Sequence, residues 1–341
     1  MKNNKFLLVL IISLILCLLV SSNVLAAQRV RISVCNAPTH PQNIGLEIMK
    51  QYVEEKTDGE IVIAVYPNSQ LGAERESVEQ CTSGSLEMAT ASAGPLTTFN
   101  NKFMVLDIPF AFDSYEVAWM VLDGPIGQEL LESCEEAGLK GLAYMENGFR
   151  HVTNSVRPIE TVEDFKNIKI RTMEAPMHME NFKLLGANPT PVPWTELYLT
   201  IQQKIVDGQE NPLANLWETK MYEVQKYASL TGHIYDPMPL VADLKWFESL
   251  TPEQQSIIEK GALLGQNYSR FVNKIREEQL VDLLTAEGME INDVSAEAKA
   301  EMREMSQDKV VQKIKDNADA DFVDKWLDAI KLAIDDVNAG L

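Results

Sequence analysis

Two arginines stand where the sequence predicts an anion site. Arg150 lies in the run NGFRHVTNS, directly after a predicted strand, and Arg171 ends the predicted strand KIKIR. In α/β proteins, ligands bind in the crevice at the carboxyl ends of parallel strands. A guanidinium group matches a carboxylate through two parallel, charge-assisted hydrogen bonds. Position alone leaves a second interpretation open, in which either arginine pairs with a structural aspartate or glutamate.

The stretch IVDGQENP, residues 205–212, contributes amide groups to the same question. A helix is expected to end at Asp207-Gly208, and a short strand is expected to run to Asn211 before Pro212 stops the pairing. At the exit of that strand, Asn211 offers both an amide donor and an acceptor to a ligand. The stretch is therefore either a solvated turn or part of a binding site.

No catalytic motif accompanies these groups. The sequence contains no GxSxG, HExxH, CxxC or Walker loop, and no GxGxxG after a strand. Cys35, Cys81 and Cys134 lack metal-ligand spacing and are expected to be small buried hydrophobes. We therefore expect no metal, no cofactor and no enzymatic reaction. Acid pairs are numerous, so a secreted hydrolase that uses two carboxylates stays open as the alternative.

The charge and the amino terminus limit the partners and the compartment. The chain has 50 acidic and 30 basic residues, a net charge of −20, which disfavours nucleic acid and anionic lipid. Residues 1–26 begin with Lys2 and Lys5, continue through an apolar stretch to Val20 and end in Ala26, the order of a secretory signal peptide. We expect export to the periplasm, with cleavage after Ala26.

The elements that would position these residues form two successive α/β units. Strands are predicted at residues 28–35, 60–66, 86–91, 141–146 and 168–171. Helices are predicted at residues 44–58, 71–81, 177–185 and 195–206, and a capped turn at 161–165. Alternating strands and helices with short connections predict the α/β class, with a parallel or mixed sheet in each unit. A helix that begins at Thr251-Pro252 and runs past Arg276 is long enough to span both units.

Several ordered motifs resemble the solute-binding proteins of tripartite ATP-independent periplasmic (TRAP) transporters. The motifs are VYPNSQLGAERE, DIPFAF, GFRHVTNSVRPIETVEDFKNIKIRT, LGANPTPVPWTELY, IVDGQENP and YEVQKY, and the resemblance covers nearly the whole chain after residue 26. It implies a two-domain periplasmic binding protein, a clamp that closes around a small organic acid. The acid would pass to the small and large membrane subunits of the transporter. The expected domain I comprises residues 27–147 and about 237–276, and domain II comprises 148–236 and about 277–341.

The ligand-binding positions of that family fall on five residues of this chain. The family's strand arginine, which pairs with the ligand carboxylate, corresponds to Arg171, and the arginine of its GFR motif corresponds to Arg150. The aromatic residue after the PTP motif is Trp194, and the asparagine of DGQENP is Asn211. The asparagine after the first strand would be Asn36.

Departures from the family pattern bear on the ligand. Ser92 and Pro95 stand where members that bind sialic acid have an acidic and a basic residue, so a nine-carbon acidic sugar is not expected. Lys204 stands where the helix before DGQENP usually has glycine, which affects packing more than ligand.

One further acid belongs to the expected site. Glu174, three residues beyond Arg171, could accept hydrogen bonds from ligand hydroxyls or could be a solvated surface acid. Together with Asn36 and Asn211 it favours a hydroxylated acid, such as a uronate or an aldonate, over a C4-dicarboxylate. Service to a chemoreceptor or to another transporter class is the remaining alternative.

Overall fold

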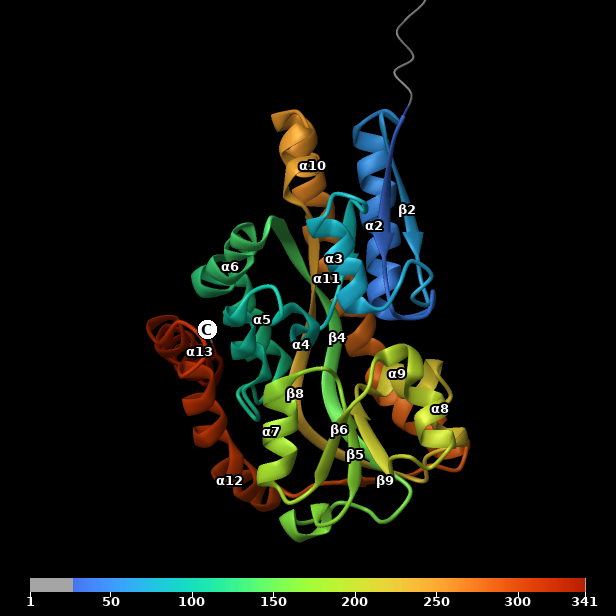
Figure 1. The fold of residues 1–341 in the computed structure, drawn as a ribbon, viewed down its shortest axis with the longest axis vertical. Helices are drawn as coiled ribbons and strands as arrows, with labels where there is room; N and C mark the ends of the chain where they lie inside the picture. The colour runs from blue at the N-terminus through green and yellow to red at the C-terminus, as the bar shows by residue number, and fades with distance from the viewer. Residues whose placement is uncertain (1–26, 341) are drawn as a thin grey trace, which may run out of the picture.

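The fold is built on one mixed sheet, which helices flank (Figure 1). It is known from a computed structural model that describes residues 27–340, so the expected signal peptide lies outside the described residues. The strands are β1 (Gln28–Ser33), β2 (Ile61–Tyr66), β3 (Met88–Thr90), β4 (Leu139–Asn154), β5 (Lys169–Thr172), β6 (Asn188–Pro191), β7 (Gly208–Asn211), β8 (Tyr227–Asp243) and β9 (Glu290–Asp293). Their order in the sheet is β2-β1-β3-β8-β4-β7-β5-β6, and β9 pairs with β8.

Helices connect and cover these strands. The α-helices are α2 (Pro41–Lys56), α3 (Glu74–Thr82), α4 (Ala93–Leu96), α5 (Tyr115–Asp123), α6 (Pro125–Glu132), α7 (Pro176–Leu184), α8 (Leu197–Gln202), α9 (Leu213–Glu218), α10 (Leu244–Ser249), α11 (Pro252–Ala286), α12 (Ala296–Lys315) and α13 (Ala320–Ala339). Short 3-10 turns are η1 (Asn101–Asp107), η2 (Ser133–Ala137), η3 (Val162–Phe165), η4 (Trp194–Glu196) and η5 (Met221–Glu223). No helix within residues 27–340 is long and apolar enough to cross a membrane.

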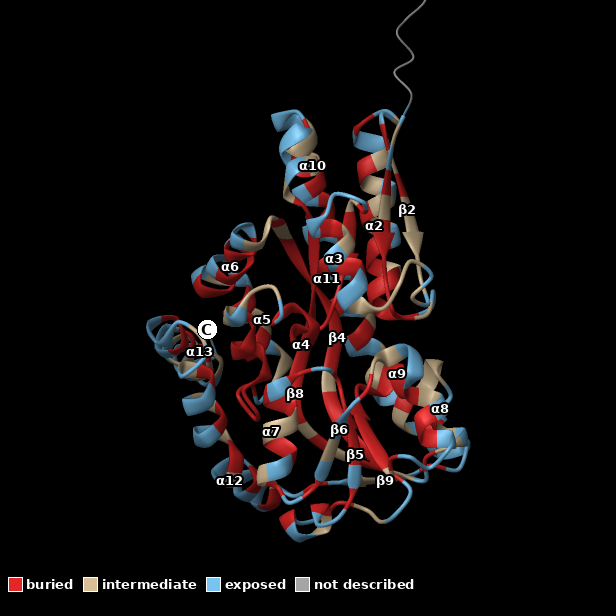
Figure 2. Cartoon of the chain, in the orientation of Figure 1, coloured by how far each residue is buried: buried red, intermediate tan, exposed pale blue. Residues whose placement is uncertain are grey.

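Two long antiparallel strands, β4 and β8, join the two halves of the sheet. The first half consists of β1, β2 and β3, in which β1 pairs in parallel with both neighbours. The second half consists of β5, β6 and β7, in which β5 pairs in parallel with both neighbours. Each half is therefore parallel, and because β3 and β7 run antiparallel to β8 and β4, the continuous sheet as a whole is mixed. Figure 2 shows how thoroughly this central pair of strands is buried.

The length of β4 and the existence of β8 differ from the sequence prediction. The fourth strand was expected to end at Glu146, but β4 continues because Gly148 adopts a φ of +116°, which side chains rarely tolerate. Register shifts on either side of this glycine let the strand bend without losing its partner β8. Arg150 therefore lies inside β4 and not in a loop after a strand.

The predicted long helix is present as α11, which has 35 residues. The Thr251 hydroxyl accepts a hydrogen bond from the Gln254 amide at its start, next to a proline at the first helical positions. α11 packs against α2 of the first half and α9 of the second. It crosses α2 closely, because a Cβ atom on Gly45 would lie 2.3 Å from the carbonyl oxygen of Gly265.

Apolar clusters fill the space between these elements in both halves. One cluster around Val30, Leu46 and Ile258 lies under the first half, and another around Ile170 and Phe182 lies under the second. The three cysteines of the described chain are free and buried, as expected for small hydrophobes.

Lys204, which stands where the resembled family usually has glycine, has an unfavourable backbone conformation. This lysine follows α8 with a φ of +58°, in the left-handed region that glycine occupies without strain. We predict that Lys204→Gly raises the free energy of unfolding by about 1 kcal/mol, because a side chain in that region is strained by about that amount. Urea denaturation measures the change. Lys166→Gly, at an exposed position with a φ of −57°, is the control and should lower stability; equal losses in both variants would contradict the assignment.

Candidate ligand-binding site

A small cavity lies between the two halves of the sheet, with a volume of about 10 Å³, about enough for one water molecule. It is lined by Cys35, Asn36, Glu74, Ser92, Asn147, Arg150, Arg171, Met173, Trp194, Asn211, Asn215 and Met238. Five of the six predicted site residues are in this lining, and Glu174 is not. Residues far apart in the sequence meet here because the carboxyl ends of β1, β5 and β7 face the same region, as in other α/β sites.

Arg150 is held by carboxylates of the protein itself. Its Nη1 donates to Asp236 Oδ2 at 2.6 Å, and its Nε donates to Glu210 Oε2 at 2.5 Å. Its Nη2 also donates to the Glu210 carbonyl oxygen at 2.6 Å. Burial opposes the charge of Arg150, but the two carboxylates outweigh it and raise its pKa. Of the two interpretations that the sequence left open for Arg150, the geometry is that of an arginine paired with structural acids.

Glu210 connects Arg150 to two buried histidines. His233 Nε2 lies 3.2 Å from one Glu210 carboxylate oxygen, and His178 Nδ1 lies 3.6 Å from the other. His178 Nε2 lies 3.1 Å from Asp107 Oδ1 on its other side. Burial favours a neutral imidazole, but the negative charges of Asp107 and Glu210 raise the pKa of His178 to about 9. The resulting chain of alternating charges reaches the cavity lining at Arg150.

Arg171 lacks such partners. Its Nε donates to the Val192 carbonyl oxygen at 2.8 Å, and its buried Nη1 has no hydrogen-bond partner within residues 27–340. The side chain is 1% exposed, and burial lowers its pKa to about 10. Burial of an uncompensated charge is unfavourable unless a counter-charge and hydrogen bonds are supplied. Of the two arginines in the cavity, Arg171 is thus the one whose charge has no carboxylate partner within residues 27–340.

Amide groups surround the arginines on both sides of the cavity. Asn215 donates from Nδ2 to Asn36 Oδ1 at 3.1 Å, a bond between α9 and the segment after β1. Asn147 donates to Asp236 Oδ2 at 2.7 Å, and Asn211 donates to Gln209. The side-chain oxygens of Asn147 and Asn215 are buried and accept no hydrogen bond within the described chain. These oxygens are acceptors that suit hydroxyl groups.

The structure places Trp194 beside the cavity, but it replaces the expected acid Glu174 with Glu74. Trp194 is half-buried and packs against the cluster around Leu46 and against a further apolar cluster that contains Leu197, Leu213 and Leu280. Glu174 is exposed, because Met173 occupies the cavity side of that segment. The acid in the lining is Glu74 at the start of α3, which accepts from the Ser92 amide at 2.8 Å. Burial raises the pKa of Glu74. Sequence reasoning did not select Glu74, although it lies in the quoted motif VYPNSQLGAERE.

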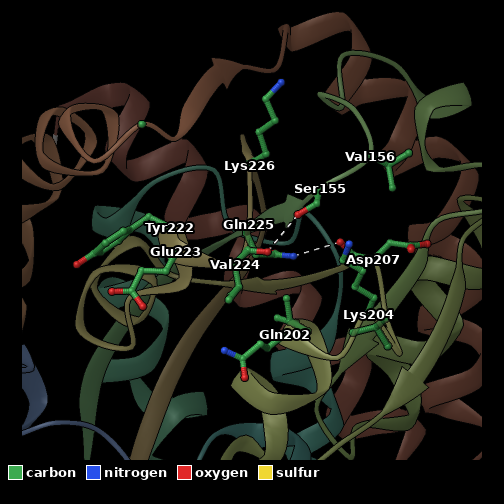
Figure 3. Close-up of a pocket in the computed structure, with 13 residues that line it drawn as sticks. Ser155, Val156, Gln202, Lys204, Asp207, Tyr222, Glu223, Val224, Gln225 and Lys226 are labelled. Atoms are coloured by element: carbon green, nitrogen blue, oxygen red, sulfur yellow. Dashed lines mark hydrogen bonds between the residues drawn. The ribbon is translucent and has the colours of Figure 1, made fainter.

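A second, wider hollow of about 680 Å³ lies at the surface of the second half (Figure 3). Its lining mixes polar and apolar residues, and the buried Gln225 within it donates to the Asp207 carbonyl oxygen at 3.1 Å. Lys226 extends away from the hollow and pairs with Glu290 at 3.0 Å. Because no buried, unpartnered charge faces this hollow, the cavity beside Arg171 is the better candidate site.

Comparison with known proteins agrees with this architecture. Residues 32–317 match the family model described as bacterial extracellular solute-binding protein, family 7. The chain belongs to this family. The resemblance drawn from the motifs is therefore confirmed, and with it the two-domain α/β fold and the role of a TRAP solute-binding protein.

Three similar proteins indicate the range of ligands in the family. The 2,3-diketo-L-gulonate-binding periplasmic protein of Escherichia coli is 35% identical over 80% of this chain and 83% of its own length. A C4-dicarboxylate-binding periplasmic protein of Rhodobacter capsulatus is 30% identical over 79% of this chain and 81% of its own. The sugar acid binding protein of Advenella mimigardefordensis, solved in complex with galactonate, is 34% identical with a TM-score of 0.86. That alignment covers 90% of this chain and 99% of the solved one.

The raised pKa of His178 makes stability dependent on pH. Because its pKa is about 9 in the folded protein and about 6.5 in the unfolded chain, its stabilisation is complete below about pH 6.5. It is lost as the pH rises through 9. We predict that the free energy of unfolding falls over this interval, and that His178→Gln removes that part of the fall. Urea denaturation at a series of pH values measures it.

His151 provides the matched control for this prediction. Burial lowers its pKa to about 3, so its contribution is present above about pH 6.5 and is lost as the pH falls. His151→Gln should therefore alter only the acidic side of the profile. An unchanged slope between pH 6.5 and 9 in His178→Gln would show that His178 is neutral in the folded protein.

Proposed function

We propose that Arg171 captures the carboxylate of a small hydroxylated organic acid for delivery to a TRAP transporter. The observation that carries this proposal is the buried guanidinium, whose Nη1 has no partner in the described chain. A ligand carboxylate would supply the missing counter-charge through two parallel hydrogen bonds. Arg150, whose charge is already balanced by Glu210 and Asp236, would instead fix the shape of the cavity floor.

The rest of the lining favours a sugar acid. The free amide oxygens of Asn147 and Asn215, with Asn36, Asn211 and Glu74, would bind hydroxyl groups along the ligand. The half-buried ring of Trp194 would cover an apolar face of the carbon chain. Relatives that bind diketogulonate and galactonate support the same class. We therefore place an aldonate or uronate first and a C4-dicarboxylate second.

The proposed action is binding followed by release, without chemical change. Glu210 and Asp236 are engaged by Arg150, so they are not the free carboxylate pair that a hydrolase would use. The periplasm would be the site of action, and the small and large membrane subunits of a TRAP transporter would receive the acid. Glu174 would at most contact a ligand group that reaches the surface.

Closure of two domains would accompany binding. We propose domain I as residues 27–147 with about 237–276, and domain II as 148–236 with about 277–341. The boundaries fall at Asn147 and Asp236, which are hydrogen-bonded to each other beside the left-handed Gly148. Here β4 also changes register against β8, so the pair of strands could bend at this point.

The central prediction compares two arginine variants with galactonate as the probe. Arg171→Lys should weaken binding by on the order of 2 kcal/mol, about thirtyfold, because lysine keeps the charge but loses the planar fork. Its unfolding free energy without ligand should change little. Arg150→Lys should lower the unfolding free energy by about 3 kcal/mol, because a buried, paired charge is disrupted. Calorimetry of binding and urea denaturation of both proteins measure the two effects.

The opposite pattern would overturn the assignment. If Arg171→Lys binds galactonate like the wild type while its folded state is destabilised, Arg171 is structural. If galactonate does not bind the wild type, the same comparison is made with succinate, the simplest C4-dicarboxylate.

Closure predicts a change of size in solution. The radius of gyration from small-angle X-ray scattering should fall when the wild type is saturated with galactonate, because a ligand that bridges both domains favours the closed arrangement. Arg171→Lys at the same ligand concentration is the control and should show a smaller fall. An unchanged radius in a wild type shown by calorimetry to be saturated would indicate a rigid pocket.

A further inference from the structure

Helix α11 has two apolar faces, and within residues 27–340 only one of them is packed against other elements. The packed face includes Ile258, Ala262 and Gly265 against the first half, and Leu280 and Leu284 against the second. The opposite face exposes large apolar side chains over about three turns. They are Leu264 (44% exposed), Tyr268 (42%), Phe271 (59%) and Ile275 (50%).

The spacing of these four residues is that of a helix-packing seam. Leu264, Tyr268, Phe271 and Ile275 follow one another at intervals of four, three and four residues, the pattern by which one helix packs along another. Contiguous exposed apolar surface of a few hundred Å² marks interaction sites on soluble proteins, whereas scattered single residues do not. We define these four residues as the α11 seam.

We propose that the α11 seam is a self-association surface, on which α11 of a second copy of this chain packs in antiparallel orientation. The seam is self-complementary under two-fold symmetry about the point between Tyr268 and Phe271. Leu264 of one copy then lies opposite Ile275 of the other, and Tyr268 lies opposite Phe271. Such an isologous arrangement closes at two copies.

The charges at the ends of the α11 seam favour this orientation. Lys260 lies one turn before Leu264 on the exposed face, and Glu278 and Asp282 lie after Ile275. An antiparallel pair places Lys260 near Glu278 of the other copy, whereas a parallel pair places like charges together.

The local composition also removes the main obstacle to self-association. The chain has a net charge of −20, which opposes contact between most parts of its surface. Residues 260–276 contain no aspartate or glutamate, so the seam brings no acid against acid. Two of the four basic residues in this range, Arg270 and Lys274, are paired with Asp123 and Glu116 of the same chain. A second copy is therefore the occupant that fits both the apolar pattern and the charges.

Analytical ultracentrifugation of the chain from Ala27 to Leu341 tests the proposal over a wide concentration range. We expect the mass to rise from one copy toward two, and Phe271→Glu to weaken the association at least roughly tenfold. Leu332→Glu is the matched control, because Leu332 is an exposed leucine (65%) on α13 and should leave association unchanged. Circular dichroism and thermal melting show that both variants are folded.

Disulfide trapping tests the orientation. Since the native cysteines of the described chain are buried, engineered pairs report the contact alone. Under mild oxidation, a mixture of Leu264→Cys and Ile275→Cys should form the mixed disulfide in preference to either self-linked dimer. A wild type that stays monomeric at all concentrations would overturn the proposal. A dimer whose stability is unchanged by Phe271→Glu would also overturn it, as would a predominant disulfide between two Leu264→Cys chains. A monomer that binds phosphatidylglycerol vesicles through Phe271 would overturn it as well. Because no step uses galactonate, these outcomes are independent of the ligand proposal.

Discussion

The electrostatics of the site depend on one difference between two buried guanidinium groups, namely the number of partners that the protein supplies to each. Arg150 has a full set of partners from Glu210 and Asp236, while Arg171 has one carbonyl partner and a buried nitrogen without any. Burial alone disfavours both charges. Within the described chain, only the charge of Arg150 is balanced by carboxylates. A carboxylate that entered the cavity would therefore lower the electrostatic energy only beside Arg171. The proposed preference for acids rests on this difference between Arg150 and Arg171.

The sheet explains how this difference is maintained. Arg150 lies on β4, and its partners Glu210 and Asp236 lie on the adjacent strands β7 and β8, so backbone pairing fixes all three together. Arg171 lies on β5, separated from β4 by β7. His178 and His233, which pair with Glu210, are not in the cavity lining. The sheet thus gives Arg150, but not Arg171, carboxylate partners from the protein itself.

The sequence predicted the local parts of this arrangement and missed the nonlocal ones. The short strand before Asn211, the capped turn at Thr161 and the start of α11 follow from neighbouring residues, and all three were predicted correctly. β8 was missed because its prolines, glycine and polar residues obscure the alternation of a strand, and only its pairing with β4 stabilises it. The partners of Arg150 and the choice of Glu74 over Glu174 depend on tertiary contacts, which no spacing reveals.

Isothermal titration calorimetry with matched pairs of acid and alcohol tests the central claim most directly. Galactonate and galactitol, erythronate and erythritol, and succinate and 1,4-butanediol differ chiefly in whether a carboxylate is present. If Arg171 requires a counter-charge, the ligand that binds is the acid of its pair, and its alcohol binds at least roughly a hundredfold more weakly. An alcohol that binds as tightly as its acid would contradict the account, because the free guanidinium would then play no part in recognition.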